Sequence, residues 1–145
     1  MAVSCSSRAM AGKIIIFDTS VFIDHLRTNR YSNNFLDLKG LIRNSSVVLS
    51  ELSRGATKEA ETAFVAALAR NHPILTPTTE NWLESGKILS KINKDKGFSP
   101  MKLRDLHFDV LIALTARNYG ATVITSNKTD FDLIRCYRDF RLDVW

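Results

Sequence analysis

Four acidic residues stand at positions from which they could act together on one substrate. Asp18, Glu51 and Asp130 each follow a short apolar run, Asp130 after a brief polar turn. Asp109 lies in the helical pattern that leads into the last run, four residues after Asp105, a spacing that aligns the two along one helix face. Because ligands bind beyond the carboxyl ends of the strands in open α/β sheets, we expect these carboxylates to gather at one sheet edge.

Carboxylates gathered in one pocket point to metal-assisted chemistry. They repel one another and become partly protonated unless a divalent cation balances their charge. Oxygen ligands suit Mg²⁺ or Mn²⁺ rather than zinc, and such ions activate water and stabilise the leaving oxygen of an in-line displacement. One Asp after a strand is more often a helix cap or turn former. The coincidence at three strand ends is what predicts metal-dependent phosphodiester hydrolysis.

The segments that must position these acids alternate between short apolar runs and longer helical patterns. Buried strands are predicted over 13–17, 47–49, 74–75 and 122–125, with a candidate last strand over 142–145. Helices are predicted from residue 20, over 34–42, 57–71 and 79–94, and around 106–114. Strands that alternate with helices imply βαβ crossovers. The expected fold class is α/β, a three-layer α/β/α sandwich with a mostly parallel central sheet.

Composition limits the class of protein. The chain has 145 residues, 45% of them hydrophobic and 24% charged, which indicates one globular domain and excludes disordered, collagen-like and coiled-coil proteins. Its apolar runs, such as Ile14–Phe17, are far shorter than the ~18 residues of a membrane span, so we expect a cytoplasmic protein without a membrane partner. The 20 basic and 15 acidic residues give a net charge of +5, which fits a polyanionic partner such as nucleic acid.

The first residues and the cysteines also carry expectations. Residues 1–12 are small and polar and lack the apolar core of a secretory signal. They are predicted to form a disordered leader, with Met10 as an alternative start, before a single domain over 13–145. Cys5 and Cys136 lie far apart without Cys-x-x-Cys spacing, so neither a disulfide framework nor a zinc site is expected.

Four short motifs occur in order along the chain. They are Ile-Ile-Phe-Asp-Thr-Ser-Val-Phe-Ile-Asp (15–24), Ser-Glu-Leu-Ser-Arg-Gly (50–55), Phe-Asp-Val-Leu-Ile-Ala (108–113) and Val-Ile-Thr-Ser-Asn-Lys-Thr-Asp-Phe (123–131). With these motifs the chain resembles the PIN-domain ribonucleases, most closely the VapC-type toxins of bacterial toxin–antitoxin modules. The resemblance implies a PIN-like fold and a metal-dependent endoribonuclease. Its Mg²⁺ or Mn²⁺ ligands, which also position the attacking water, would be Asp18, Glu51, Asp109 and Asp130.

The resemblance also settles roles that spacing leaves open. It favours Asp109 over Asp105, which is then expected to cap its helix, and it implies that Thr125 and Asn127 support the site, although Asn127 could equally be a turn residue. It further implies cleavage of tRNA or other structured RNA, a homodimer, and a cognate antitoxin whose tail covers the active site.

Basic side chains are candidate RNA contacts. Lys87, Lys91 and Lys94 fall on adjacent turns of one predicted helix, where they form either a phosphate-binding stripe or a solvated helix face. Arg54, three residues after Glu51, would either approach the scissile phosphate or pair with a site carboxylate as a structural tether. The tether is the favoured reading.

Two other functions stay open from the sequence. A non-catalytic PIN-like RNA-binding or protein-interaction domain would keep the acids as caps. A flavodoxin-like regulatory domain with an acidic phospho-acceptor pocket shares the acidic sheet edge, but no lysine directly follows the last strands, where such a pocket needs one. The three histidines share no spacing with the acids, which predicts surface or helix-end roles for His25, His72 and His107.

Overall fold

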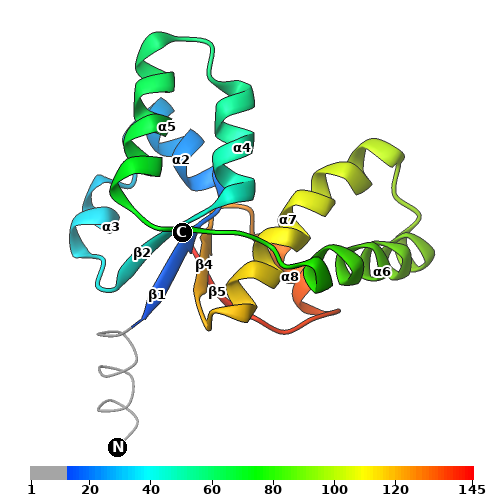
Figure 1. The fold of residues 1–145 in the computed structure, drawn as a ribbon. Helices are drawn as coiled ribbons and strands as arrows, with labels where there is room; N and C mark the ends of the chain where they lie inside the picture. The colour runs from blue at the N-terminus through cyan, green and yellow to red at the C-terminus, as the bar shows by residue number, and fades with distance from the viewer. Residues whose placement is uncertain (1–12) are drawn as a thin grey trace, which may run out of the picture.

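A five-stranded sheet forms the centre of the molecule, as the computed structural model of residues 13–145 shows (Figure 1). The predictions for residues 1–12, including the leader, Met10 and Cys5, lie outside the described residues. The strand order is β3-β2-β1-β4-β5, and every neighbouring pair is parallel. The strands are β1 (Ile14–Phe17), β2 (Leu41–Ser45), β3 (Ile74–Leu75), β4 (Thr122–Thr125) and β5 (Arg141–Val144). Their carboxyl ends therefore meet at one edge, as expected.

Seven helices flank this sheet within residues 13–145, which confirms the three-layer α/β/α class. They are α2 (Thr19–Thr28), α3 (Ser32–Asp37), α4 (Ser46–Gly55), α5 (Glu59–Asn71), α6 (Thr79–Lys96), α7 (Pro100–Asn118) and α8 (Lys128–Arg135). In Figure 1 the α4–α5 pair and the α6–α7 pair extend as two arms from the sheet, with α8 beside α7. None of the helices in this part of the chain is long and apolar enough to cross a membrane.

The segment 47–49 is helical, and its prediction as a strand was wrong. Ser45 is the N-cap of α4, and its Oγ accepts hydrogen bonds from the backbone N–H groups of Val47 and Val48 at 3.1 and 3.3 Å. β-Branched residues favour strands locally, but this preference is weak and depends on context. Here the N-cap and the burial of both valines in the core override it.

The predicted helix over 34–42 was also wrong in its second half, where residues 38–40 form a connection and residues 41–42 begin a strand. Helix α3 ends at Asp37, and the neighbour of β1 is β2, in which Leu41 pairs with Ile14. Between them Gly40 has a φ of +149°, and a Cβ there would lie 2.7 Å from the Lys13 carbonyl oxygen. This glycine lets the chain approach β1 closely, and pairing with β1 makes a strand of residues that match a helical pattern.

Most of the remaining elements agree with their predicted positions within a few residues, but α7 starts six residues before the predicted segment, and α8 was not predicted. β3 and β4 coincide with the predicted strands, and β5 begins one residue earlier than the predicted last strand. Helices α5 and α6 cover the predicted segments, and Gly120, with a φ of +62°, follows the end of α7.

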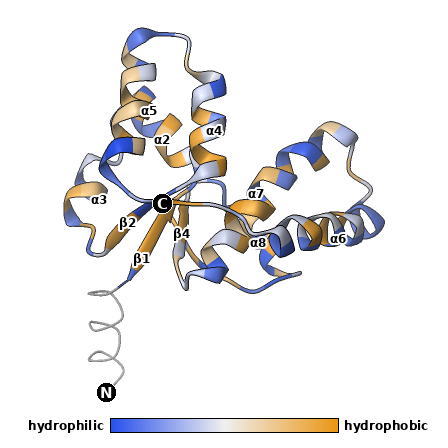
Figure 2. Cartoon of the chain, viewed as in Figure 1, coloured by the Kyte–Doolittle hydropathy of each residue, from blue (hydrophilic) through white to orange (hydrophobic). Residues whose placement is uncertain are grey.

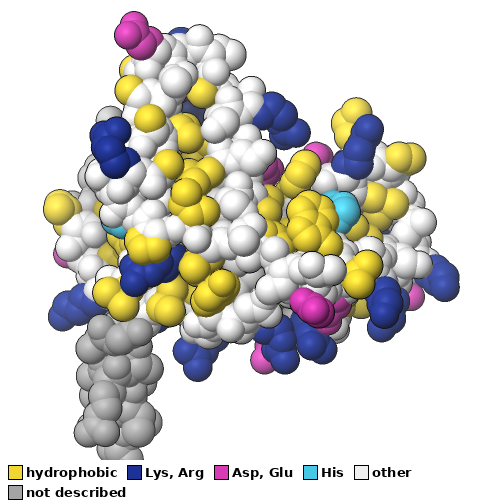
Figure 3. All heavy atoms as spheres, viewed as in Figure 1, with side chains coloured by type: hydrophobic (Ala, Val, Ile, Leu, Met, Phe, Trp, Pro, Cys, Tyr) yellow, Lys and Arg dark blue, Asp and Glu magenta, His cyan; other side chains and the backbone are white. Residues whose placement is uncertain are grey.

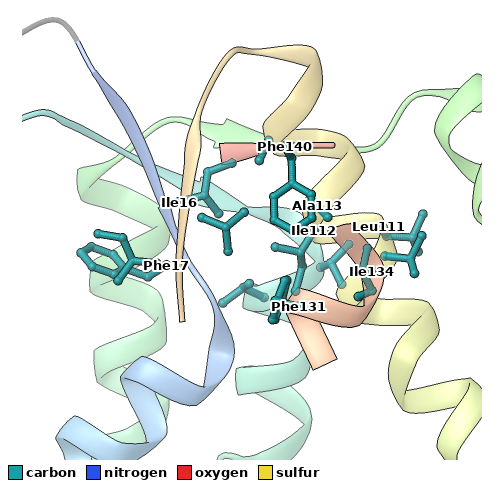
Figure 4. Packing of buried hydrophobic residues seen from close by; sticks show 14 of the residues in the cluster. Ile16, Phe17, Leu111, Ile112, Ala113, Phe131, Ile134 and Phe140 are labelled. Atoms are coloured by element: carbon teal, nitrogen blue, oxygen red, sulfur yellow. The ribbon is translucent and has the colours of Figure 1, made fainter. Parts of the chain in front are cut away.

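The core lies on both sides of β1 and β4, which explains the uninterrupted apolar sequence of β1 and the burial of every residue of β4. Figure 4 shows Ile16 from β1 close to Ile112 and Ala113 from α7 and to Phe131 from α8. Strand β1 is correspondingly hydrophobic in Figure 2, whereas the loops at the far ends of the two arms are largely hydrophilic. Helix α7 buries residues on several sides because it contacts α6, α8, α4 and β4. This packing fixes α7 beside the carboxyl edge of the sheet.

Candidate functional site

Asp18 lies where β1 turns into α2, at the N-cap position of the helix. Its side chain is buried, and Oδ2 accepts hydrogen bonds from Ser20 Oγ at 2.7 Å and from Thr125 Oγ1 at 2.9 Å. Burial raises the pKa of Asp18, and the two hydroxyl hydrogen bonds offset part of that rise. The carboxylate is therefore held in one orientation by neutral donors from two strand ends.

Glu51 reaches the same region from α4, not from the end of a strand as predicted. Its Oε1 accepts a 2.9 Å hydrogen bond from Thr19 Oγ1, so the residue beside Asp18 positions it. The pKa of Glu51 is raised, first by burial and then by the negative charges of Asp18 and Asp105. Glu51 and Asp18 are thus close enough to repel each other.

Asp109, on α7, is the carboxylate that joins the cluster. Burial raises its pKa well above the ordinary value, and the charges of Asp18, Glu51 and Asp130 raise it further, while Lys102 opposes them. Within residues 13–145 no side chain donates a hydrogen bond to its carboxylate. All four predicted acids therefore interact electrostatically around Asp109.

Asp130 lies in the first turn of α8 and forms an ion pair with a lysine. Lys102 Nζ donates to Oδ1 at 2.7 Å and to Oδ2 at 2.8 Å. Asn127 Nδ2 donates to Oδ2 at 3.0 Å, and Asn127 Oδ1 accepts from the Asp130 backbone N–H at 3.4 Å. Asn127 is thus both the N-cap of α8 and a direct contact of Asp130.

Thr125 connects the two ends of this arrangement. Besides donating to Asp18, its Oγ1 accepts a 2.9 Å hydrogen bond from the backbone N–H of Asn127. A second link runs from the Ser126 backbone N–H to Ser20 Oγ at 3.1 Å. The loop after β4 is consequently tied to the loop after β1, and the predicted supporting residues Thr125 and Asn127 both contact site acids.

Sequence reasoning missed three contacts of the acids, made by Thr19, Ser20 and Lys102. Thr19 and Ser20 follow Asp18 directly, and a short hydroxyl side chain beside an acid was the available signal. Lys102 precedes Asp109 by seven residues, two helical turns, which places them on one face of α7. That spacing could have indicated a lysine close to the acids.

Two expectations about neighbouring residues change. Asp105 does not cap its helix, a prediction that was wrong, because α7 begins at Pro100 and Ser99 caps it by accepting from the Lys102 backbone N–H. The favoured tether is not formed either, since Arg54 makes no ion pair within residues 13–145. Its guanidinium instead lies over the Phe108 ring, 5.6 Å from the centroid.

In the described residues, neither the predicted lysine stripe nor the histidines form a hydrogen bond with the four acids of the candidate site. Lys87, Lys91 and Lys94 are exposed on α6. Figure 3 shows Lys and Arg side chains on both arms, with acidic side chains in the recess between them. His107 Nε2 lies 2.9 Å from Ser85 Oγ, and burial lowers the pKa of this histidine.

The donor set fits a hard divalent cation, although the carboxylates are held apart. All four candidate ligands offer carboxylate oxygens, which suit Mg²⁺ and Mn²⁺, and their mutual repulsion favours a bound cation. Within residues 13–145, however, no three His, Cys, Asp or Glu side chains come close enough to hold an ion together. Three of the four carboxylates are instead bound by protein donors, from Thr125, Thr19 and Lys102.

Comparison with known families identifies the class of protein. Residues 15–135 match the family model of the PIN domain. The chain therefore belongs to the PIN domain family, whose members are generally nucleases.

Solved structures with the same fold are similar over almost the whole chain. A VapBC2 complex from Rickettsia felis bound to a promoter DNA fragment has a TM-score of 0.66 at 23% identity, covering 91% of this chain and 98% of that chain. DNA-bound VapBC from Salmonella typhimurium has a TM-score of 0.63 at 24% identity, covering 92% and 98%. FitAB bound to an IR36 DNA fragment has a TM-score of 0.62 at 18% identity, covering 90% and 94%. The comparison with curated proteins gives no match.

Proposed function

We propose that this protein is a Mg²⁺- or Mn²⁺-dependent endoribonuclease that hydrolyses phosphodiester bonds in tRNA or other structured RNA. The observation that carries the proposal is the cluster of Asp18, Glu51 and Asp130 around Asp109, whose pKa is raised by burial and further by their charges. Such a cluster is electrostatically unfavourable by itself and becomes favourable with a cation. Family membership supports a nuclease, and the all-oxygen donor set supports these two ions.

In this proposal Asp18, Glu51, Asp109 and Asp130 hold the ion, which supplies a water of lowered pKa and polarises a phosphoryl oxygen when bound. The chain's other residues set the geometry. Ser20 and Thr125 orient Asp18, Thr19 orients Glu51, and Asn127 orients Asp130. Burial of Asp18 strengthens electrostatic interactions there, because the local dielectric is lower than in water.

RNA is expected to approach along the basic arms. Lys87, Lys91 and Lys94 on α6 and Arg54 at the end of α4 are all exposed, so they are available to phosphates. The Arg54 guanidinium lies over the ring of Phe108, which directly precedes Asp109 in α7. Arg54 is therefore near the acidic cluster. These side chains would bind flanking phosphates while the acidic cluster, balanced by its ion, acts on the scissile one.

The direct test is cleavage of purified tRNA with Asp109→Asn and Asp18→Asn proteins. We expect Mg²⁺-dependent cleavage to fall at least about a hundredfold in each. Asp132→Asn is the matched control, because this α8 carboxylate pairs with Lys128 and makes no contact with the cluster. Undiminished cleavage by folded Asp109→Asn protein would sink the assignment.

The proposal extends to a toxin that acts in the cytoplasm as a homodimer and is inhibited by a cognate antitoxin. It is supported by the relatives of similar fold, which were solved as VapBC complexes. A small reading frame directly upstream is the candidate inhibitor. Co-expression should yield a stable complex with suppressed RNA cleavage, and a complex that still cleaves RNA at the full rate contradicts this part.

The alternative is a non-catalytic PIN-like domain that binds RNA or protein. One observation favours it, namely that no three site acids lie within reach of a single ion in the described residues. Calorimetric titration with Mg²⁺ in the presence and absence of RNA separates the two functions. A binding module shows RNA affinity without metal-coupled hydrolysis.

A further inference from the structure

Lys102 occupies both oxygens of one proposed metal ligand. Its ammonium lies 2.7 and 2.8 Å from Asp130 Oδ1 and Oδ2, although the two residues belong to α7 and α8. The Asp130 side chain is 13% exposed, whereas the Lys102 side chain is 36% exposed. The ion pair therefore sits at the rim of the cluster, with its cationic partner on the solvent side.

This contact differs in kind from those of the other acids. Asp18 and Glu51 are held by neutral hydroxyls, which leave their negative charge in place. Asp130 is held by a full positive charge, which also opposes the rise in the pKa of Asp109. Lys102 thus partly balances the cluster in the manner of a cation.

An ammonium and a divalent ion on the same carboxylate repel each other and compete for its oxygen lone pairs. Lys102 uses both Asp130 oxygens, and Asn127 Nδ2 adds a second contact to Oδ2. A divalent ion held by Asp130 would repel the ammonium at short range and so favour its release. The flexible four-carbon stem and partial exposure of Lys102 let the ammonium move into water at little cost.

We propose that Lys102 is an exchangeable counter-ion of Asp130, which leaves the carboxylate when a divalent cation binds there. The inference rests on the proposed function, because the cation is the one proposed for cleavage. It accounts for the ammonium that lies on Asp130 in this structure. Exchange would also turn a neutralised lysine into a free positive charge beside the site at which RNA phosphates arrive. Lys102 is thus a positioning residue.

The test is calorimetric titration of the full chain with Mn²⁺ after removal of bound metal. Lys102→Met should bind Mn²⁺ roughly tenfold more tightly than the wild type, because the competing charged hydrogen bonds are gone. Lys102→Arg keeps a cation on Asp130 and should bind no more tightly than the wild type. Lys91→Met removes an exposed lysine of α6 and should change the affinity less than about twofold.

Three results overturn the proposal. They are an equal or weaker Mn²⁺ affinity in Lys102→Met, an equal gain in Lys91→Met, and no Mn²⁺ binding by either the wild type or Lys102→Met. A lysine with a merely structural role would lower Mn²⁺ affinity on removal, so the sign of the change separates the roles. Thermal unfolding checks that each variant is folded. If Lys102→Met does not fold, Lys102→Gln is used in its place.

A second measurement follows the ammonium directly. In protein labelled with ¹⁵N-lysine, the Lys102 ammonium signal, assigned from its loss in Lys102→Met, should shift and exchange faster with water on adding Mg²⁺. A signal unchanged at saturating Mg²⁺ overturns the exchange. RNA cleavage is assayed separately. A protein that shows the exchange but cuts no RNA disproves the nuclease alone, and one that cuts RNA without the exchange disproves only the role of Lys102.

Discussion

Thr125 Oγ1 donates a 2.9 Å hydrogen bond to Asp18 Oδ2, joining residues 107 positions apart in the chain. Asp18 and Thr125 each come directly after a residue of a paired position, because Phe17 of β1 lies beside Ile124 of β4. The parallel register therefore delivers an acid and a hydroxyl to the same sheet edge. The pairing of β1 with β4 therefore positions this part of the candidate site.

Thr125→Val keeps the shape of the side chain and removes this donor. We expect a loss of about 1–2 kcal/mol in the free energy of unfolding, because a buried carboxylate loses a hydrogen bond and the Asn127 backbone N–H loses its acceptor. The pKa of Asp18 should rise further, since the Thr125 hydrogen bond lowers it. Urea unfolding and carboxyl NMR titration measure the two effects. Thr122→Val is the control, as Thr122 is buried in the same strand and its hydroxyl makes no hydrogen bond within residues 13–145. An equal loss there argues against the Asp18 contact as the cause.

Asp109→Asn should change how stability depends on pH. The folded protein raises the pKa of Asp109 well above its ordinary 3.8, so it binds this proton more tightly than the unfolded chain does. That contribution is complete below the unfolded pKa and is lost as pH rises through the folded pKa. The variant should therefore gain stability relative to the wild type as pH rises from about 4 towards neutral pH. Urea unfolding at several pH values measures this difference, and a difference that does not grow with pH contradicts the prediction.

Divalent ions should stabilise the wild type and not Asp109→Asn. At a hundred times the dissociation constant, ligand binding to the folded state adds about 2.7 kcal/mol. The midpoint of thermal unfolding should rise with Mn²⁺ and return to its starting value with EDTA. Zn²⁺ is not a suitable substitute, because the proposed ligands are all oxygens. Equal stabilisation of Asp109→Asn would indicate that the ion binds elsewhere.

Replacing Lys87, Lys91 and Lys94 together by Gln tests the stripe on α6. If all three contact phosphates of single-stranded RNA, the slope of log affinity against log salt should decrease by about 2. Fluorescence anisotropy with a labelled RNA at several salt concentrations measures this slope. Lys39 and Lys58, exposed residues outside α6, supply the control as Lys39→Gln/Lys58→Gln. An unchanged slope in the triple variant marks the stripe as a solvated helix face.

Local sequence patterns determined the class of fold and the acids of the candidate site. Strand β1 could be read directly, because a strand buried on both faces must be apolar throughout and Asp18 ends it abruptly. Helix α5 was equally clear, since its good helix formers need no distant partner to indicate a helix. Asp18 and Asp130 were expected together because parallel strands bring their carboxyl ends to one edge.

Tertiary structure decided what local preference could not. Residues 47–49 are helical because the Ser45 cap and the burial of both valines in the core outweigh their strand preference. Leu41–Ser45 form a strand because β2 pairs with β1, a contact that no short window of sequence contains. The ion pair of Lys102 with Asp130 is of the same kind, since it depends on how α7 lies against α8. The sequence alone is enough to predict which carboxylates form the candidate site, whereas the packing of the helices and strands determines which donors bind each carboxylate. Those donors determine the charge that an incoming ion meets.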